Sequence, residues 1–495
     1  MSDVDIKLTK SQKVVLKQLK DFVFHSEDRV FILKGYAGTG KTTLMRFLIA
    51  ELEKKEEQYR LLSTTGRAAK ILANHTDREA TTIHSMIYRY KDFNKDLSNI
   101  DDKKASVDET GQLFLVFEPT VLSVEDRNRV IYIVDESSMI SDMEDKDITQ
   151  AKFGSGRILK ELLDYDPYPE SKFIFVGDPC QLPPILGTIS PALTPSYFEQ
   201  TFGLKCQEGS LTEIMRQDNS IVSAGAYIRK LWNMAPENEN PYGAVWGSPL
   251  QMSAYDDVKI HSDLLEMEQL YLQNIRKKGY NDSTFICSSN SKCLEMSQKI
   301  RNSLGFTGPV QVGDLLMVTQ NQLLTGLMNG DMVEVVGLSS ETERTFKTVH
   351  TPDGYQTELV FREIRVKELF TNKEYSTLLL ETILNDSQVN LDARQQSGLF
   401  LDFVIRMKRQ EITQKKNKEQ FDRAMRMDPY LNALRCNYGY AITCHKSQGG
   451  EWNSVYIQMP RNITRKPTKN KYQWFYTALT RAKHTVHICK DFFIK

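Results

Sequence analysis

The sequence predicts an α/β protein built on two parallel sheets, and three short apolar runs are the main evidence. Residues 30–33, 130–134 and 173–176 are apolar throughout and alternate with segments of helical periodicity. A strand that is apolar on both faces is typical of a parallel sheet covered by helices on both sides. The same alternation begins again near residue 281 and returns close to the C-terminus, which predicts a second α/β unit.

Two stretches interrupt this alternation and are predicted to be insertions. Residues 91–110 are polar and mixed in charge, and a short hairpin strand is expected at 113–117. Residues 311–380 carry short β segments with turn signals such as Asn329-Gly330-Asp331, and residues 400–427 are predicted to form a charged helix. The predicted units are a first core at 1–88 and 129–205 with an insertion at 89–128, and a second core at 206–312 and 430–495 with an insertion at 313–429.

The charge balance narrows the class of protein. The chain has 495 residues, with 64 Lys and Arg against 64 Asp and Glu, so its formal net charge is zero. This balance argues against a protein coated with positive charge for nucleic acid. It is compatible with a local basic track, and residues 461–483 contain several Lys and Arg but no acid. A hydrophobic share of 40% is ample for packed cores, so a disordered chain is excluded.

The sequence shows neither a targeting segment nor a cysteine pattern typical of disulfides or a zinc site. There is no run of about 18 apolar residues and no apolar signal core among residues 1–10, so no membrane contact and a cytoplasmic location are expected. The seven cysteines include no C-x-x-C pair. Free, buried thiols in a reducing compartment are therefore expected rather than a zinc site or disulfides.

A glycine-rich segment after the first apolar run carries the chemistry of phosphate binding. Gly35 to Thr42 matches G-x-x-x-x-G-K-[ST] and lies between a strand and a helix, which is the context that the motif requires. Glycines let backbone N–H groups point at phosphate oxygens, and the helix N-terminus adds partial positive charge. We expect Lys41 to neutralise the β and γ phosphates of a nucleotide and Thr42 to bind Mg²⁺. Further residues of this segment predicted to contact the nucleotide are Gly38, Thr39, Gly40 and Thr43.

Two adjacent carboxylates follow the apolar run at 130–134. Asp135 and Glu136 would be costly at the end of a buried strand unless they perform electrostatic work. We expect Asp135 to hold Mg²⁺ and Glu136 to orient and deprotonate the attacking water. An isolated Asp-Glu pair is more often a solvated strand end, so the upstream phosphate loop is what favours the catalytic interpretation.

Three further side chains are candidates for sensing the γ-phosphate. Gln181 lies in the polar cluster Gly177–Pro184, after the third apolar run. Arg216 lies near the boundary between the two α/β units, and Arg481 lies in Tyr476–Lys483. Planar cations from a second domain stabilise the charge of a phosphoryl-transfer transition state. An isolated surface arginine is more often simply solvated. Only the pattern of motifs along the whole chain can therefore favour a role at the γ-phosphate.

Five further segments follow the phosphate loop in a fixed order: Thr65–Lys70, Thr82–Ser85, Gly177–Pro184, Tyr440–Glu451 and Tyr476–Lys483. They resemble motifs Ia, Ib, III, V and VI of the superfamily 1 helicases, and within them the RecD-like and phage Dda-like branch. The string at 443–449 is very specific, because few other proteins contain it. The resemblance implies two RecA-like P-loop NTPase domains, an SH3-like β insertion in the second, and a strand-separating hairpin at 89–128.

The resemblance also implies roles for individual residues. Gln12 would read adenine, Glu451 would contact the ribose, and Arg481 would act as the arginine finger with Gln181 and Arg216. Trp452 stands where this branch often has Phe. The implied activity is ATP- and Mg²⁺-dependent movement along single-stranded DNA, 5′ to 3′, with unwinding of forked duplex DNA. The positions at which the family contacts single-stranded DNA are Thr65, Arg67, Thr82, His84, Thr443, His445 and Lys446. Asn290 is a further candidate for the same track.

Other functions fit part of the same pattern. A translocase that remodels protein–nucleic acid complexes, or one that acts on RNA, would carry the same motifs. A nucleotide-gated DNA-binding module would hydrolyse little ATP, and Glu136 and Arg481 weigh against it. A small-molecule kinase gives no reason for the segment at 443–449. The sequence leaves open the pathway, among replication, recombination and repair, as well as the protein partners and the oligomeric state.

Overall fold

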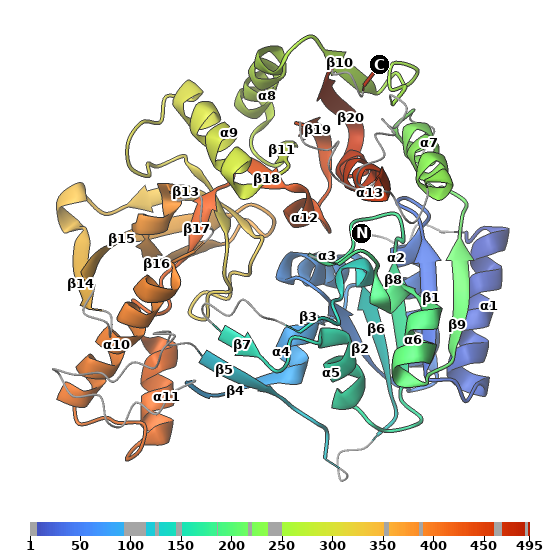
Figure 1. The fold of residues 1–495 in the computed structure, drawn as a ribbon, viewed down its shortest axis with the longest axis horizontal. Helices are drawn as coiled ribbons and strands as arrows, with labels where there is room; N and C mark the ends of the chain where they lie inside the picture. The colour runs from blue at the N-terminus through green and yellow to red at the C-terminus, as the bar shows by residue number, and fades with distance from the viewer. Residues whose placement is uncertain are drawn as a thin grey trace, which may run out of the picture.

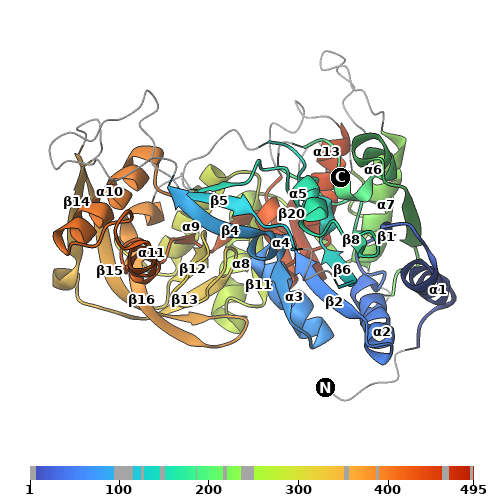
Figure 2. The ribbon, with the colours of Figure 1, turned by 90° about the horizontal axis from the view of Figure 1, so that it is seen from below.

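The computed structural model describes residues 7–495 except for 94–114, 124–127, 145–150, 186, 216–219, 236–249, 351–355, 386–389, 460–467 and 491–493. Two parallel α/β units lie side by side, and an antiparallel β insertion extends from the second unit (Figure 1). In the view of Figure 2, helices α1 (Lys10–His25) and α2 (Lys41–Lys54) mark one end of the molecule and the β insertion marks the other.

The first unit is a six-stranded sheet in the order β3-β2-β6-β8-β1-β9, and all neighbouring strands run parallel. Alternate residues of its apolar strands face two helical layers, α1–α3 on one side and α4–α6 on the other. The strands are β1 (Val30–Gly35), β2 (Gln58–Ser63), β3 (Ala80–Thr82), β6 (Val130–Asp135), β8 (Lys172–Gly177) and β9 (Cys206–Leu211), and the remaining helices are α3 (Gly66–Thr76), α4 (Ile83–Ile87), α5 (Ile158–Tyr165) and α6 (Pro195–Phe202).

The second unit is a five-stranded parallel sheet in the order β10-β20-β19-β11-β18. One face packs on α7 and α13, and the other packs on α8 and α9. The predicted fold class, α/β with two parallel sheets, is confirmed. The elements are α7 (Ser220–Met234), β10 (Val258–His261), α8 (Leu264–Lys278), β11 (Ser283–Cys287), α9 (Asn290–Ser303), β18 (Ala441–Thr443), α12 (Cys444–Ser447), β19 (Trp452–Ile457), α13 (Thr468–Leu479) and β20 (Ala482–Cys489).

The β insertion is a third, antiparallel sheet in the order β14-β15-β13-β12-β17, with β16 paired to β15. Its resemblance to an SH3 fold stays a prediction. The charged helix expected at 400–427 is two helices, with a turn between them in which Glu411 has a left-handed φ of 61°. The elements are β12 (Leu315–Val318), β13 (Met332–Leu338), β14 (Thr345–His350), β15 (Gln356–Glu368), β16 (Glu374–Leu380), α10 (Ala393–Arg409), α11 (Lys418–Met427) and β17 (Cys436–Tyr438).

A small sheet of β4 (Tyr88–Phe93), β5 (Leu115–Pro119) and β7 (Ala151–Phe153) projects from the first unit. The tip between β4 and β5 lies outside the described residues. The apolar side of α10 and α11 packs against Tyr90 and Leu115 of this small sheet. The two insertions, far apart in sequence, therefore touch each other (Figure 1).

Three predicted boundaries need correction. β9, which we expected in the second core, joins the first sheet as an edge strand on β1, and its polar sequence concealed it. β17, also expected in the second core, pairs antiparallel with β12 and belongs to the insertion sheet. β7, expected in the first core, pairs with β5 of the small sheet. Each is a short strand whose partner is remote in sequence, so the local pattern could not place it.

Two expectations about the whole chain can be compared with the structure. None of the seven cysteines forms a disulfide bond; five are buried, and Cys206 and Cys489 are half-buried, where buried thiols were expected throughout. Within the described residues, no helix combines the length and apolar character that crossing a membrane requires.

A buried ion pair fastens the β insertion to the second unit, and breaking it tests that attachment. Arg301 of α9 contacts both carboxylate oxygens of Asp314, at 2.8 Å and 2.8–3.1 Å, and both residues are buried. Removing one partner of such a pair costs about 3–5 kcal/mol, because a buried charge is left without compensation. We therefore expect Asp314→Ala to lower the midpoint of thermal unfolding by about 5–15 °C.

The matched control is the exposed pair Lys292–Glu295 at the start of the same helix. Glu295→Ala should shift the midpoint by about 2 °C or less, because exposed pairs contribute about 0–1 kcal/mol. Equal shifts for the two variants would contradict the attachment.

Candidate nucleotide cleft and nucleic-acid face

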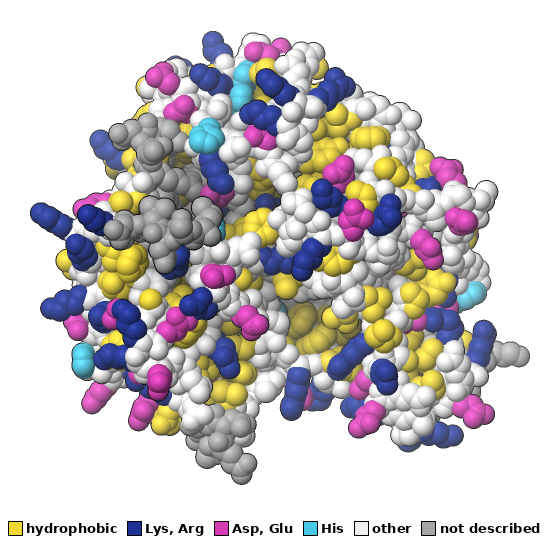
Figure 3. All heavy atoms as spheres, turned by 180° about the vertical axis from the view of Figure 1, so that it is seen from behind, with side chains coloured by type: hydrophobic (Ala, Val, Ile, Leu, Met, Phe, Trp, Pro, Cys, Tyr) yellow, Lys and Arg dark blue, Asp and Glu magenta, His cyan; other side chains and the backbone are white. Residues whose placement is uncertain are grey.

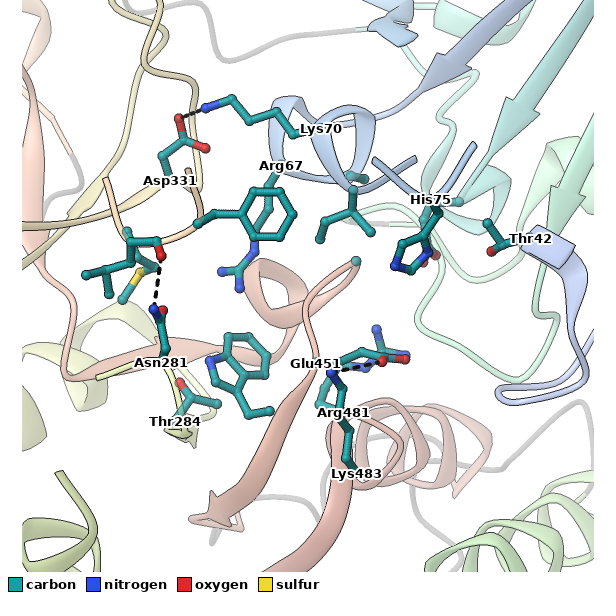
Figure 4. A pocket seen from close by; sticks show the side chains of 18 of the residues that line it. Thr42, Arg67, Lys70, His75, Asn281, Thr284, Asp331, Glu451, Arg481 and Lys483 are labelled. Atoms are coloured by element: carbon teal, nitrogen blue, oxygen red, sulfur yellow. Dashed lines mark hydrogen bonds and ion pairs between the residues drawn. The ribbon is translucent and has the colours of Figure 1, made fainter. Parts of the chain in front are cut away.

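A cleft of about 760 Å³ separates the two α/β units (Figure 4). One wall is formed at the carboxyl ends of β1 and β6, and the other at the amino ends of β19 and β20. It brings together most of the predicted ATP-site residues: Gly38, Gly40, Lys41, Thr42, Thr43, Asp135, Glu136, Gln181, Glu451 and Arg481.

The phosphate loop has the backbone that its glycines predict. Gly38 and Gly40 have left-handed φ values of 78° and 79°, which an L side chain rarely adopts. Lys41 begins α2 and turns back, so that its Nζ donates to the carbonyls of Gly35 at 2.8 Å and Tyr36 at 3.1 Å. A triphosphate would give this ammonium an anionic partner in place of two neutral carbonyls.

Gln12 supports the phosphate loop from α1. Its Nε2 donates to the carbonyl of Thr39 at 3.1 Å, and its Oε1 accepts from the backbone N–H of Thr9 at 3.1 Å. Thr9 in turn caps the helix, which completes a capping box. A Cβ at Gly40 would lie 2.6 Å from the Gln12 amide, so this position requires glycine for space as well as for φ. The role of Gln12 as the adenine reader stays a prediction.

Asp135 and Glu136 lie at the end of β6, on the floor of the cleft. Glu136 has a left-handed φ of 51°, a strained conformation that is common at functional sites. Desolvation raises the pKa of Asp135, and desolvation together with the charge of Asp135 raises the pKa of Glu136. Lys41 and Arg481 oppose the shift for Glu136. The carboxylates therefore lack enough positive charge and would be stabilised by a cation.

The donor set of this wall fits Mg²⁺. Thr42 and Asp135 offer a hydroxyl and a carboxylate, the hard oxygen ligands that Mg²⁺ prefers together with phosphates and water. The buried hydroxyls of Ser63, which pairs with Asp135 across the sheet, and of Ser138 have no hydrogen-bond partner in the described part of the chain. Among the described residues no group of three His, Cys, Asp or Glu could hold a metal by itself. Bound there, Mg²⁺ would neutralise the β and γ phosphates.

A glutamine links the two walls of the cleft. With its side-chain amide assigned from its partners, Gln181 donates to Glu136 Oε2 at 3.3 Å and accepts from Arg481 Nη2 at 3.0 Å. Arg481 is buried and is also held by the carbonyl of Thr477 at 3.1 Å. The catalytic carboxylate of one unit is thus connected through one amide to a guanidinium of the other.

Of two other residues predicted for the ATP site, the structure places Glu451 in the cleft but does not describe Arg216. Glu451 lines the cleft beside Lys483, whose Nζ lies 3.9 Å from Glu451 Oε2 (Figure 4). Arg216 lies outside the described residues. Its role as a γ-phosphate sensor stays a prediction.

Three predicted DNA contacts share one local arrangement. Thr65 lies just after β2, and Thr82 and Thr443 are the last residues of β3 and β18. Each caps the next helix, with the side-chain oxygen accepting the backbone N–H three residues on. Ser289, just before Asn290, does the same for α9. The strands concerned are neighbours, β2 and β3 in the first sheet and β11 and β18 in the second. A hydroxyl beside the N–H groups of a helix's first turn is suited to a backbone phosphate.

The other candidates on this face vary in exposure. Asn290 is exposed, and His445 and Lys446 are half-buried in α12, where desolvation lowers the pKa of Lys446. His84 packs against the rings of Tyr88 and Phe153, with centroids 5.5 and 5.3 Å away, and desolvation lowers its pKa. These contacts show a structural role for His84, and its contact with DNA stays a prediction.

Arg67 lies elsewhere. It lines the ATP cleft, and its guanidinium stands 4.7 Å from the ring centroid of Trp452 in the second unit (Figure 4). Desolvation lowers its pKa to about 10. In the same helix Lys70 forms an ion pair with Asp331 of the β insertion. The sequence marked Trp452 as a departure from the family, but nothing in the spacing indicated Arg67 as its partner.

Fold and site together define a two-domain P-loop ATPase, whose nucleotide would lie between a phosphate loop on one sheet and an arginine on the other. The chain matches an AAA domain model over residues 7–230 and a UvrD-like helicase C-terminal domain model over residues 438–489. The resemblance to the superfamily 1 helicases is thereby confirmed, and the matches indicate an ATP-hydrolysing enzyme of the helicase class.

Individual relatives are distant. An uncharacterized protein of Acanthamoeba polyphaga mimivirus is 22% identical over 526 residues, covering 95% of this chain and 97% of that protein. ATP-dependent DNA helicase dda of Enterobacteria phage T4 is 28% identical over 232 residues, covering 46% of this chain and 44% of that protein. A solved structure described as two coordinating Pif1 helicases at forked double-stranded DNA aligns with 99% of this chain and 94% of that chain, at 16% identity and a TM-score of 0.47.

Glu136→Gln tests the assignment of the catalytic base. The amide keeps the shape but cannot take a proton, so we expect kcat for ATP hydrolysis to fall by about 10²- to 10⁴-fold. Binding of a fluorescent ATP analogue should persist, because Lys41 and the loop are unchanged. Glu144→Gln, at an exposed carboxylate further along the chain, is the control. Hydrolysis by Glu136→Gln within tenfold of the unmodified protein would contradict the assignment.

Proposed function

We propose that this chain is an ATP-driven motor that moves along single-stranded DNA from 5′ to 3′ and unwinds duplex DNA ahead of it. The observation that carries the proposal is the connection from Glu136 through Gln181 to Arg481. Because these groups come from two units, the chemistry of ATP becomes sensitive to how closely the units approach. A motor requires this dependence, whereas a passive nucleotide-binding module does not.

The residues of the cleft would have different roles in ATP hydrolysis. The loop N–H groups and Lys41 would bind the β and γ phosphates, and Glu136 would accept the proton of the attacking water. Arg481 would stabilise the negative charge that develops on the γ-phosphoryl oxygens. Since Arg481 is fixed to the end of α13, its approach to the phosphate moves the whole second sheet.

The opposite ends of the second-sheet strands support a nucleic-acid track. Thr443 ends β18 and Asn290 follows the carboxyl end of β11, while the ATP cleft lies at the amino ends of β19 and β20. With Thr65 and Thr82 of the first unit, they would contact backbone phosphates without reading sequence. Closing and reopening the cleft would change the spacing between these two groups of contacts and thereby advance the strand.

The surface charge fits a motor that must release its strand in every cycle. Lys and Arg are interspersed with Asp and Glu on the face shown in Figure 3, without a continuous basic field. A uniformly positive surface would hold nucleic acid tightly and in a salt-dependent manner. A narrow track of local contacts is sufficient for translocation.

The small sheet of β4, β5 and β7 is the proposed strand-separating element. It projects from the first unit, and α10 and α11 of the other insertion brace it through Tyr90 and Leu115. A braced hairpin would resist the force of an advancing duplex better than a free one. Remodelling of protein–nucleic acid complexes and action on RNA are the alternative activities of the same motor.

Lys41→Ala tests the motor itself. Without the ammonium the phosphates lose their principal counter-charge, so we expect loss of both ATP hydrolysis and unwinding of a forked DNA substrate. Lys54→Ala, at an exposed lysine on the same helix, should behave like the unmodified protein. Unwinding retained in full by Lys41→Ala would refute the proposal.

Direction and substrate need a separate experiment. Duplexes with a 5′ tail or a 3′ tail, each made with a DNA or an RNA tail, should be compared at equal concentrations. We expect unwinding of the 5′-tailed DNA substrate, with ATPase stimulated by its tail. Unwinding only of the 3′-tailed substrate would overturn the proposed direction. An ATPase rate unaffected by any tail would favour the nucleotide-gated binding module.

A further inference from the structure

The two α/β units are joined beside the ATP cleft by the loop at 178–182. The backbone N–H of Leu182 donates to Thr477 Oγ1 at 3.0 Å, and Gln473 Nε2 donates to the carbonyl of Gln181 at 3.1 Å. Thr477 and Gln473 belong to α13 of the second unit. This loop and this helix therefore form a hydrogen-bonded joint, in contrast to the open cleft nearby.

One side chain of α13 extends this joint to the phosphate loop. The hydroxyl of Tyr476 donates to Asp178 Oδ2 at 2.8 Å and accepts from the backbone N–H of Ala37 at 3.2 Å. The same N–H lies 2.9 Å from Asp178 Oδ2. Tyr476 and Asp178 are each 1% exposed. A backbone amide of the phosphate loop is thus held directly by a residue of the other unit.

An arginine reinforces the same contact. Arg229 of α7 lies over the ring of Tyr36 at 4.2 Å and is 5.8 Å from the ring of Tyr476. Tyr36 precedes Ala37 in the phosphate loop, so two consecutive residues of its first half contact the second unit. The other half of the loop is held by Gln12 through Thr39. The loop is therefore fixed from two sides, by α1 of its own unit and by α7 and α13 of the other.

We propose that Tyr476 is a positioning residue for ATP binding, which sets the shape of the first half of the phosphate loop according to the position of the second unit. This proposal deepens the proposed function and rests on it for its role in the motor. Tyr476 touches no reacting atom. Its effect passes through Ala37 and Asp178, whose backbone and carboxylate define the entrance to the loop.

Removing only the hydroxyl of Tyr476 distinguishes a positioning role in ATP binding from a contribution to stability alone. In Tyr476→Phe the buried Asp178 loses one of its donors, while the ring that faces Arg229 remains. We expect the KM for ATP to rise about 5- to 20-fold. This is less than the roughly 10- to 150-fold effect of losing a whole buried hydrogen bond to a charged group, because Asp178 keeps the backbone N–H groups of Ala37 and Cys180 as donors. We expect kcat at saturating ATP to change by less than about threefold, because no group of the chemical step is altered.

The matched control is a second buried tyrosine–aspartate bond in the first unit. Tyr132 donates to Asp166 Oδ2 at 2.9 Å, and both residues are buried away from the ATP cleft. Tyr132→Phe removes the same kind of bond, so it should lower thermal stability to a similar extent and leave the KM for ATP unchanged. A rise in KM in both variants, or in neither, would overturn the proposal.

A second variant covers the case in which Tyr476→Phe folds poorly. Arg229→Lys loses the planar group over Tyr36 but keeps the charge, and a smaller rise in KM, about two- to fivefold, is expected from a cation–π contact. An unchanged KM in Arg229→Lys would count against the proposal. The dissociation constant of a fluorescent, non-hydrolysable ATP analogue should follow KM in each variant. Because this binding measurement needs neither DNA nor hydrolysis, it tests the positioning role even if the motor function fails.

Discussion

The joint between the loop at 178–182 and α13 is the contact on which the arrangement of the molecule depends. Here the backbone of the first unit hydrogen-bonds to side chains of the second, next to the phosphate loop and Gln181. Because the two units are hydrogen-bonded at one edge of the cleft, the motion that keeps these bonds is a rotation of one unit against the other about that edge. ATP in the cleft would then be compressed or released by a rotation about this edge, without separation of the units.

The parallel sheet of the second unit explains why the ATP cleft and the predicted DNA contacts lie at opposite edges of that unit. All its strands run in the same direction, so their amino ends form one edge and their carboxyl ends form the other. Glu451 and Arg481 lie at the first edge, and Thr443 and Asn290 follow the second. A rotation that closes one edge on ATP necessarily moves the other edge relative to the first unit. A rigid sheet would in this way couple the proposed hydrolysis of ATP to movement at the predicted DNA contacts.

Much of this could be predicted because the decisive signals are local. The strands β1, β6 and β8 are apolar on both faces, and the Gly35–Thr42 segment requires a strand before it and a helix after it. Pairings between remote segments could not be predicted in this way. β9 is too polar to be recognised as a strand, and it forms only because the edge of β1 is available. The bond from Tyr476 to Ala37 joins residues 439 positions apart, which no spacing rule reveals.

Helix α3 carries residues of both the predicted DNA contacts and the ATP cleft, and Arg67 is the one in the cleft. The motif alone was not sufficient to place Arg67 there. Thr65 caps α3 with an extended backbone, and its side chain accepts the N–H of Ala68, whereas Arg67 is the second residue of the helix itself. Two residues of one motif therefore have different surroundings. Thr65 lies with the predicted DNA contacts, and Arg67 lies in the ATP cleft against Trp452. A shift of α3 caused by nucleic acid at Thr65 would move Arg67 within the cleft, so this helix offers a second path between the two sites, independent of the joint at α13.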